Sequence, residues 1–377
     1  MHGKRLLCRM YAKHRAARYT KKQKLRNLWK GKKQIAAIGC LLIGAGVLYC
    51  RELPLLCFPE RGYERMKNSA MLRVQNAEEE ELLSIQYAGA PGTYLTVRHA
   101  DGAIPVFLPP EKEAEPVSVR DILEERFGPL EQIAFGSFLS NYYIEDMSTK
   151  ATEDMLNPIL LAEYPLQMEQ KEEPQILIFH THASEGYLDS REGMTEDTVV
   201  GAGSLLAEIL RKEYGYNVIH ETTVFDRKAD GSDDRNNAYS NALPVITAIL
   251  DKYPSIEVVI DLHRDSGEAR TCVLNGVNTA KVMLFNGLCR TKDGPITYYS
   301  NQNLTGNLAF SLHLQITGNE RYPGLMHRIY LKSYRYNMHL KEKYLLVELG
   351  THKNTVAEAK AAMRPFAETL AAVLSGK

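Results

Sequence analysis

The sequence predicts an α/β fold: a mostly parallel, twisted sheet flanked by helices, preceded by a single transmembrane helix and a stalk region. In the C-terminal half, short apolar runs rich in β-branched residues alternate with segments whose apolar residues recur at helical spacing. Such alternation is typical of layered domains with largely parallel strands. A charged linker, QMEQKEEP, ends at Pro174, where this texture begins. We therefore expect one folded domain over residues 174–377.

Five strands and four helices are expected in this domain. The strands are residues 176–179, 216–219, 256–262, 282–285 and 344–347, and the helices are residues 199–213, 243–250, 303–316 and 356–374. Gly215 stands where the C-cap of the first helix belongs, since glycine readily adopts the left-handed conformation that ends many helices. Pro244 is expected in the first turn of the second helix, where its missing N–H costs little.

The N-terminal region has a marked charge asymmetry. The first 51 of the 377 residues contain fourteen Lys and Arg and no Asp or Glu, which leaves 32 of the 46 basic residues against all 46 acidic ones in the remainder. The charge-free run at 35–50 is predicted to be a transmembrane anchor, slightly shorter than the usual span of about 17–25 residues. The positive-inside rule then keeps residues 1–34 in the cytoplasm as a basic arm and places the rest outside the membrane.

Two alternatives for this region are disfavoured. A cleavable signal peptide fits poorly because the basic region exceeds thirty residues in length. Nucleic-acid binding is disfavoured because a topogenic, anionic-lipid-binding tail accounts for the arm. Residues 51–173 are interpreted as a stalk and accessory region, with a strand near 93–97 and a helix near 119–127. The six cysteines lack C-x-x-C spacing and predict neither a disulfide framework nor a thiolate metal site.

Polar side chains capable of metal chemistry follow three of the expected strands. They are His180, His182 and Glu185 after the first; Asp261, His263, Arg264 and Asp265 at the end of the third; and Glu348 after the last, with His352 beyond it. Carboxyl ends of parallel strands lie at one edge of a sheet, where ligands bind. Imidazole and carboxylate ligands with one open position make a catalytic zinc site, and a further carboxylate can act as general base.

Each residue of this set also has a structural interpretation. A lone histidine after a strand is usually a hydrogen-bonded turn residue, but two histidines at i and i+2 of an extended chain point the same way. Asp261 and Arg264 are interpreted as a partner that orients a ligand and as an ion-pair partner. Carboxylate pairs drawn from Glu185, Asp265 and Glu348 would suit a glycosidase, but they leave the histidines unexplained.

Five ordered motifs resemble the stage II sporulation protein P family, cell-wall hydrolases that act when endospore-forming bacteria engulf the forespore. The motifs are HTHASEGY, IDLHRD, YPGL at 322–325, YN at 336–337 and LLVELGTHKNT. The resemblance covers residues 174–375 and the anchor. It implies a fold similar to zinc-dependent N-acetylmuramoyl-L-alanine amidases, a Zn²⁺ cofactor, and cleavage of the MurNAc–L-alanine amide and of peptide cross-links. The implied partners are peptidoglycan and stage II sporulation proteins D and M.

Carried over residue by residue, the amidase pattern assigns His263 as the second histidine ligand and Glu348 as the catalytic carboxylate. The first ligand is His180 or His182, which the sequence does not separate. The acidic ligand is Glu185, favoured because it lies in the family motif, or Glu196. The rival functions are a metal-dependent peptidoglycan deacetylase and a non-catalytic wall-binding scaffold. A degenerate scaffold should have lost some of these residues, and the chain keeps them all.

Overall fold

The computed structural model describes residues 84–87, 94–99, 102–107 and 118–376. The basic arm and the expected anchor fall at residues 1–50, outside the described residues, so both stay predictions. Among the residues described, no helix is both long and apolar enough to span a bilayer.

The chain divides into two units. The described part of the first unit is a three-stranded sheet in the order β1 (Ser84–Tyr87), β2 (Tyr94–His99) and β3 (Gly102–Phe107). Strands β1 and β2 pair antiparallel. The strand expected near residues 93–97 is thus present as β2.

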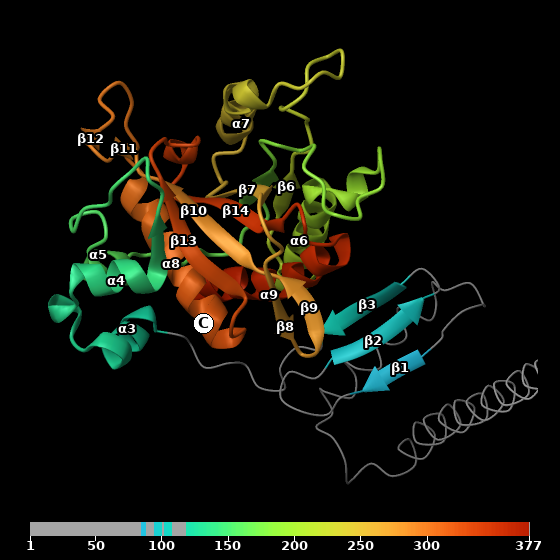
Figure 1. Cartoon of the computed structure of the whole chain (residues 1–377), viewed down its shortest axis with the longest axis horizontal. Coiled ribbons are helices and arrows are strands. Elements are labelled where there is room, and N and C mark those ends of the chain that lie inside the picture. Colours follow the sequence, from blue (N-terminus) through green and yellow to red (C-terminus); the bar gives the residue numbers. More distant parts are fainter. Residues whose placement is uncertain (1–83, 88–93, 100–101, 108–117, 377) are drawn as a thin grey trace, which may run out of the picture. The chain divides into compact units, whose positions relative to one another are not determined.

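The second unit is built on a seven-stranded sheet, which Figure 1 shows at its centre. Its order is β4 (Tyr143–Glu145), β13 (Met326–Lys332), β10 (Val282–Gly287), β14 (Lys343–Thr351), β7 (Val258–Asp265), β5 (Ile176–Phe179) and β6 (Val218–His220). Neighbours in this described sheet pair parallel except for β10 and β14, which pair antiparallel. The expected mostly parallel sheet is therefore confirmed, as two parallel blocks of opposite direction.

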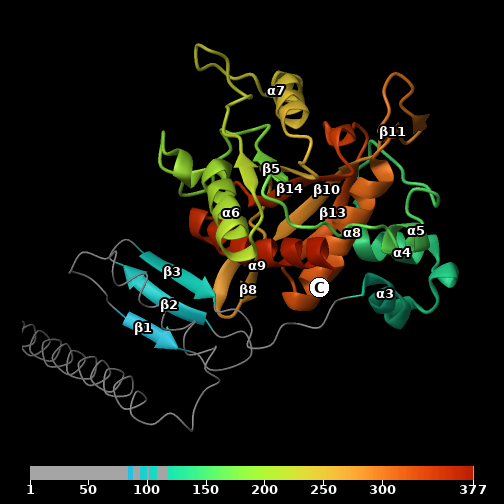
Figure 2. The same cartoon turned by 180° about the vertical axis from the view of Figure 1, so that it is seen from behind.

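Helices cover both faces of this sheet, but unequally. They are α3 (Val119–Phe127), α4 (Phe135–Tyr142), α5 (Pro158–Ala162), α6 (Val199–Tyr214), α7 (Ala238–Lys252), α8 (Leu304–Arg321) and α9 (Val356–Ser375). One large apolar cluster joins α6, α8 and α9 to the sheet. A smaller cluster joins α7 to β5, β7 and β14 on the other face. Both views place α7 across the strands from α8 and α9 (Figures 1 and 2).

Capping explains where two of the expected helices begin and end. The Thr198 side chain accepts from the N–H of Val200 at the start of α6, and Gly215 ends the helix with φ 73°. At α9, Thr355 and Glu358 form a reciprocal capping box. Both helices match their expected ranges within a residue or so.

Helix α7 begins five residues earlier than expected. Pro244 therefore lies inside the helix and not in its first turn, so that expectation was wrong. A proline there removes one intrahelical hydrogen bond. The helix is held nonetheless by an apolar stripe at helical spacing, Ala238, Ala242, Ile246 and Leu250, which is buried along its whole length.

The folded domain begins earlier than the expected boundary at residue 174. Strand β4 is an edge strand of the main sheet, paired with β13, and Leu123, Phe138 and Leu161 are fully buried in the large apolar cluster. Residues 118–173 are therefore part of the domain, and the interpretation of this stretch as a stalk needs correction. The edge strand β4 and its neighbour β13 were also not predicted. The helix expected near 119–127 is α3.

This finding predicts that Phe138→Ala destabilises the whole domain. Phe138 has no exposed surface and meets Tyr142 and Tyr143 edge-on, so its loss should lower the free energy of unfolding by about 3–5 kcal/mol. Denaturant unfolding measures the change. The control, Leu160→Ala on α5, removes a half-exposed side chain and should cost about 0.5 kcal/mol or less. Unchanged stability in Phe138→Ala would mean that residues 118–173 are an appendage.

Candidate active site

A polar cluster lies on the α7 face of the sheet, where the apolar cluster of that face ends. Strands β7 and β14 pair in register, with Leu346 beside Asp261 and Glu348 beside His263. Because strand side chains alternate between faces, Asp261, His263 and Glu348 share one face. Val259 and Tyr344, further toward the strand starts, belong to the apolar cluster under α7. The site thus continues a buried stripe with polar residues.

His263 is held between two carboxylates. Its Nε2 lies 2.7 Å from Asp261 Oδ1, and its Nδ1 lies 3.6 Å from Glu185 Oε2. Asp261 also accepts hydrogen bonds from the backbone N–H of Thr181 (2.8 Å) and from its hydroxyl (2.6 Å). Burial lowers the pKa of His263, but the two carboxylates outweigh burial and raise it well above its ordinary value. The contact with Asp261 therefore restricts the orientation of the imidazole.

Glu185 is 3% exposed and is surrounded by positive charge. It accepts from the Arg235 guanidinium at 2.7 Å, from the backbone N–H of Arg264 at 3.1 Å and from the Arg264 guanidinium at 3.4 Å. Burial alone would raise its pKa, but His263 and the two arginines lower it to about 2. Glu185 is therefore a carboxylate at neutral pH.

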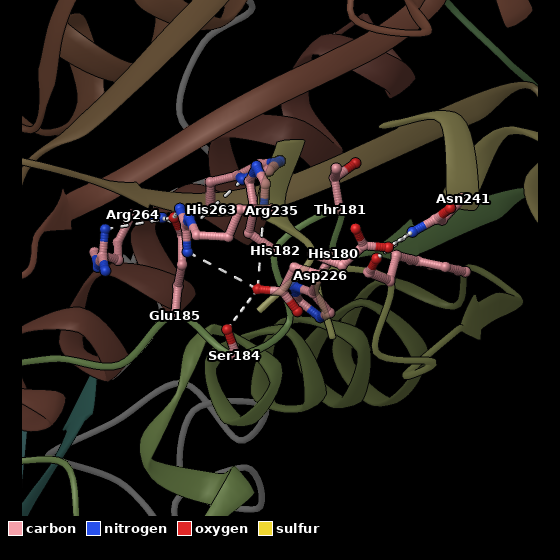
Figure 3. Close-up of polar contacts among 12 residues, drawn as sticks. His180, Thr181, His182, Ser184, Glu185, Asp226, Arg235, Asn241, His263 and Arg264 are labelled. Carbon is pink, nitrogen blue, oxygen red and sulfur yellow. Dashed lines mark hydrogen bonds and ion pairs between the residues drawn. The ribbon is translucent and has the colours of Figure 1, made fainter. Parts of the chain in front are cut away.

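His182 meets His263 edge-on, with ring centroids 5.4 Å apart. Its Nδ1 is 3.8 Å from Asp226 Oδ2 and is buried, with no hydrogen-bond partner in the described part of the chain. Asp226 is fully buried, accepts from the Ser184 hydroxyl and lies 3.8 Å from Arg235. Figure 3 shows these side chains gathered with Glu185 and Arg264.

His180 takes no part in this cluster. Its Nδ1 is 2.8 Å from the Leu262 carbonyl oxygen, and its Nε2 is 2.9 Å from Nε2 of His220. Burial lowers the pKa of His180 to about 3 and that of His220 to about 4, so both rings are neutral at pH 7. Residues 181–184 form a turn directly after β5. The two histidines therefore do not share an extended stretch of chain and diverge, contrary to expectation.

Of the two candidate acidic ligands, Glu185 lies in the cluster and Glu196 lies outside it. Glu196 lies in the short 3-10 helix Thr195–Asp197, half exposed and 3.7 Å from Arg191, and is not part of the cluster. Asp265 pairs with Arg270 at 2.6 Å. Arg264 donates to the Gly186 carbonyl oxygen as well as to Glu185. The structure thus brings together His182, Glu185, His263 and Glu348.

Glu348 differs from Glu185 in its surroundings. Its Oε2 is buried and finds no hydrogen-bond partner among the residues described. Burial raises the pKa of Glu348 to about 8, with a further increase from Glu185 and Asp265 and a decrease from His263. One carboxylate of the site is thus held ionised, and the other can carry a proton near neutral pH. Paired carboxyl groups with divergent pKa values are typical of acid–base sites.

Several residues of the site were not predicted. Asp226 and Arg235 lie between β6 and α7, Tyr239 lies in the first turn of α7, and His220 ends β6. Tyr239 stacks on His263 with ring centroids 6.3 Å apart and an interplanar angle of 18°. The other site residues were predicted because they directly follow an apolar strand. These residues do not stand in that position, so their connection to the site is visible only in the fold.

The donor set fits a zinc ion, although the geometry is not that of a formed site. No group of three or more His, Cys, Asp or Glu side chains within the described ranges stands in ligand geometry. Two imidazoles and a carboxylate are nevertheless the ligands of many catalytic zinc sites. The Nδ1 of His182 has no hydrogen-bond partner among the described residues, and the Nδ1 of His263 lies 3.6 Å from the Glu185 carboxylate. His180 has both ring nitrogens engaged and does not fit.

Comparison with known proteins decides the family. The family model of stage II sporulation protein P matches residues 118–371. The chain belongs to this family. The match confirms the resemblance found in the sequence. Stage II sporulation protein P of Bacillus subtilis (strain 168) is 23% identical over 208 residues, which cover 51% of this chain and 49% of that protein. The chain thus spans about half the length of this relative.

Two solved structures with some similarity to this chain are those of amidases. The N-acetylmuramyl-L-alanine amidase Ami1 of Mycobacterium abscessus has a TM-score of 0.33 and 13% identity, covering 53% of this chain and 97% of that one. The CwlD amidase of Clostridioides difficile, in complex with the GerS lipoprotein, has a TM-score of 0.32 and 14% identity, covering 54% and 95%.

The close packing of His180 and His220 under α6 predicts a cost for enlarging Gly203. A Cβ at this position would lie 2.7 Å from His180 Cε1 and 3.0 Å from His220 Nε2. Gly203→Ala should therefore lower the free energy of unfolding by about 1–3 kcal/mol. The matched control is Gly136→Ala in α4, where a Cβ meets open space; it should be neutral or stabilise by up to about 1 kcal/mol. Equal effects of the two substitutions in thermal unfolding would refute this packing.

Proposed function

We propose that this protein is a zinc-dependent peptidoglycan hydrolase of sporulation that cleaves the amide between MurNAc and L-alanine, and peptide cross-links as well. The observation that carries the proposal is the register of β14 and β7, which sets Glu348 beside His263 on the face where His182 and Glu185 converge. Membership in the stage II sporulation protein P family supports the cell-wall substrate.

His182, Glu185 and His263 would hold the zinc ion, and Asp261 would orient His263 through the nitrogen that does not bind the metal. A bound zinc ion supplies a Lewis acid that polarises the scissile carbonyl and lowers the pKa of water. Glu348 accepts a proton from the attacking water on its unpartnered Oε2 and delivers it to the leaving nitrogen. The same residue can do both because its pKa, raised to about 8 by burial, lies near neutrality.

Arg235 and Arg264 compete with a metal for Glu185. Both guanidinium groups contact its Oε1, and the backbone N–H of Arg264 contacts its Oε2. Arg235 is the more exposed of the two, since its side chain is 39% accessible against 19% for Arg264, and it also neighbours Asp226. A shift of Arg235 toward Asp226 would remove the shorter of the two guanidinium contacts on Oε1 and keep the Arg235 charge paired.

Metal content tests the ligand assignment. The purified chain should contain about one zinc, and His182→Ala, His263→Ala and Glu185→Gln should each lose most of it because each removes one of the three proposed ligands. His180→Ala and Glu196→Gln should keep it, since neither side chain is in the cluster. Elemental analysis of the purified variants measures this. Loss of zinc from His180→Ala but not from His182→Ala would reverse the assignment of the first ligand.

Glu348→Gln separates base from ligand. The amide keeps the size of the side chain but cannot accept the proton, so release of muropeptides should fall by about 10²–10⁴. Zinc content and retention on peptidoglycan should be unchanged, with Glu196→Gln as the fully active control. Chromatography of the released products identifies the bond cleaved and distinguishes an amidase from a deacetylase. If Glu348→Gln loses its zinc, Glu348 is a ligand and the roles must be redrawn.

We also propose that residues 35–50 anchor the protein with its N-terminus in the cytoplasm and its catalytic domain outside. The support is the distribution of charge, with the fourteen basic residues up to Arg51 unbalanced by any acidic one. Protease added outside intact protoplasts should digest residues from 60 onward and spare the basic arm. Digestion of the arm alone would reverse the orientation. Sporulation proteins D and M stay predicted partners.

A further inference from the structure

The α7 face of the sheet is only half covered by its apolar cluster. That cluster draws its residues from β5, β6, β7, β14, α7 and the short 3-10 helix Met338–Leu340. On the β10 and β13 side of the same face stand Phe285 and Tyr330, which are register partners. Their rings contact one another, with centroids 5.7 Å apart. We use the name tyrosine strip for Tyr239, Tyr330, Tyr334, Tyr336 and Phe285.

The tyrosine strip is continuous with the candidate active site. Tyr239 stacks on His263 and meets His182 edge-on at 5.8 Å. Tyr336 contacts Tyr239 at 5.3 Å and Phe285 at 4.8 Å, both edge-on. Tyr334 extends the row from Tyr336 at 6.4 Å. A molecule lying along these rings would reach the two imidazoles.

The loop that carries the strip is held in an unusual backbone conformation. Tyr336 and Asn337 have φ of 49° and 59°, a region that residues other than glycine adopt at a cost. Asn337 donates to the Tyr239 carbonyl oxygen at 2.9 Å. Gly287 permits the close approach of this loop, since a Cβ there would lie 2.0 Å from the Tyr334 carbonyl oxygen. Strain that the surrounding contacts maintain is commonly found at functional sites, and here it fixes the ring of Tyr336 between Tyr239 and Phe285.

The outer end of the strip is exposed. Tyr334 has 54% of its surface accessible. The inner members are partly covered, and the Tyr330 hydroxyl donates to the Asp146 carboxylate. A row of aromatic side chains that leads from an exposed tyrosine to a polar site is a candidate binding surface.

From this arrangement we infer that the tyrosine strip binds the sugar rings of a glycan strand and leads the strand to the active site. This inference rests on the proposed function and names the part of the substrate that the strip recognises. Tyrosine offers a rigid apolar face with a hydroxyl at its edge. A sugar ring has matching features, an apolar C–H face and peripheral hydroxyls.

Binding is tested with the full chain carrying Glu348→Gln, so that the substrate is not consumed. The probes are peptide-free glycan strands and, separately, free stem peptides. Adding Tyr334→Ala should weaken binding of the glycan strands roughly tenfold, the loss expected when one exposed ring contact is removed. Tyr334→Phe keeps the ring face and should bind within about twofold of the parent. Leu160→Ala, on α5, is the control for loss of exposed apolar surface and should bind as the parent does.

Calorimetric titration gives the affinities, and thermal unfolding confirms that each variant is folded. Unchanged glycan binding by Tyr334→Ala overturns the inference, as does a loss seen with stem peptides alone. Hydrolysis by the chain with Glu348 intact is measured alongside. If Tyr334→Ala loses glycan affinity but the chain with Glu348 intact hydrolyses no peptidoglycan, the proposed function is refuted and the glycan site is kept. If that chain hydrolyses peptidoglycan but Tyr334→Ala keeps full glycan affinity, the strip is refuted and the hydrolase is kept.

Discussion

The parallel pairing of β14 with β7 is the constraint on which the site depends. Because the register is fixed over Lys343–Glu348 against Val258–His263, Glu348 can only lie beside His263, and Asp261 one step back on the same face. The register is in turn fixed by the apolar stripes of the two strands, since a slip of one residue would move Val259 and Tyr344 out of their cluster and Asp261 into the core beneath α8 and α9. One strand register therefore fixes both the packing of the core and the positions of the polar side chains in the site.

The antiparallel pairing of β10 with β14, the one such pair in the described seven-stranded sheet, decides at which end of the sheet the loops after β10 and β13 lie. The β4–β13–β10 block runs opposite to the block that carries the polar strand ends, so the loops that follow β10 and β13 leave from the other end of the sheet. After β13 the chain continues as the loop that carries Tyr334 and Tyr336, and Tyr336 contacts Phe285 of β10. A fully parallel sheet would have put these loops at the same edge as His182. The reversal instead lays aromatic rings along the face.

The sequence predicts the sheet well where strands are long and apolar, and poorly elsewhere. Ile176–Phe179 was predicted at its observed bounds because four consecutive buried side chains leave no other interpretation. Strand β4 has three residues, and β13, beside it, alternates buried with half-exposed positions, so neither has a comparable pattern. The candidate site follows the same division: residues on β7 and β14 were found, whereas Asp226, in a loop, and Arg235, in a short 3-10 helix, were not.

The choice between His180 and His182 shows why spacing alone could not place a side chain. Two residues apart in a strand, both histidines would face the same way; in the turn that follows β5, His182 faces Asp226 and His180 faces His220. The turn is fixed by Asp261, which accepts two hydrogen bonds from Thr181, the residue between the two histidines. Asp261 therefore orients His263 directly and His182 through the backbone. Asp261 is thus in contact both with the ring of His263 and with the turn that carries His182. The residue first interpreted as a secondary partner is thus the one that assembles the site.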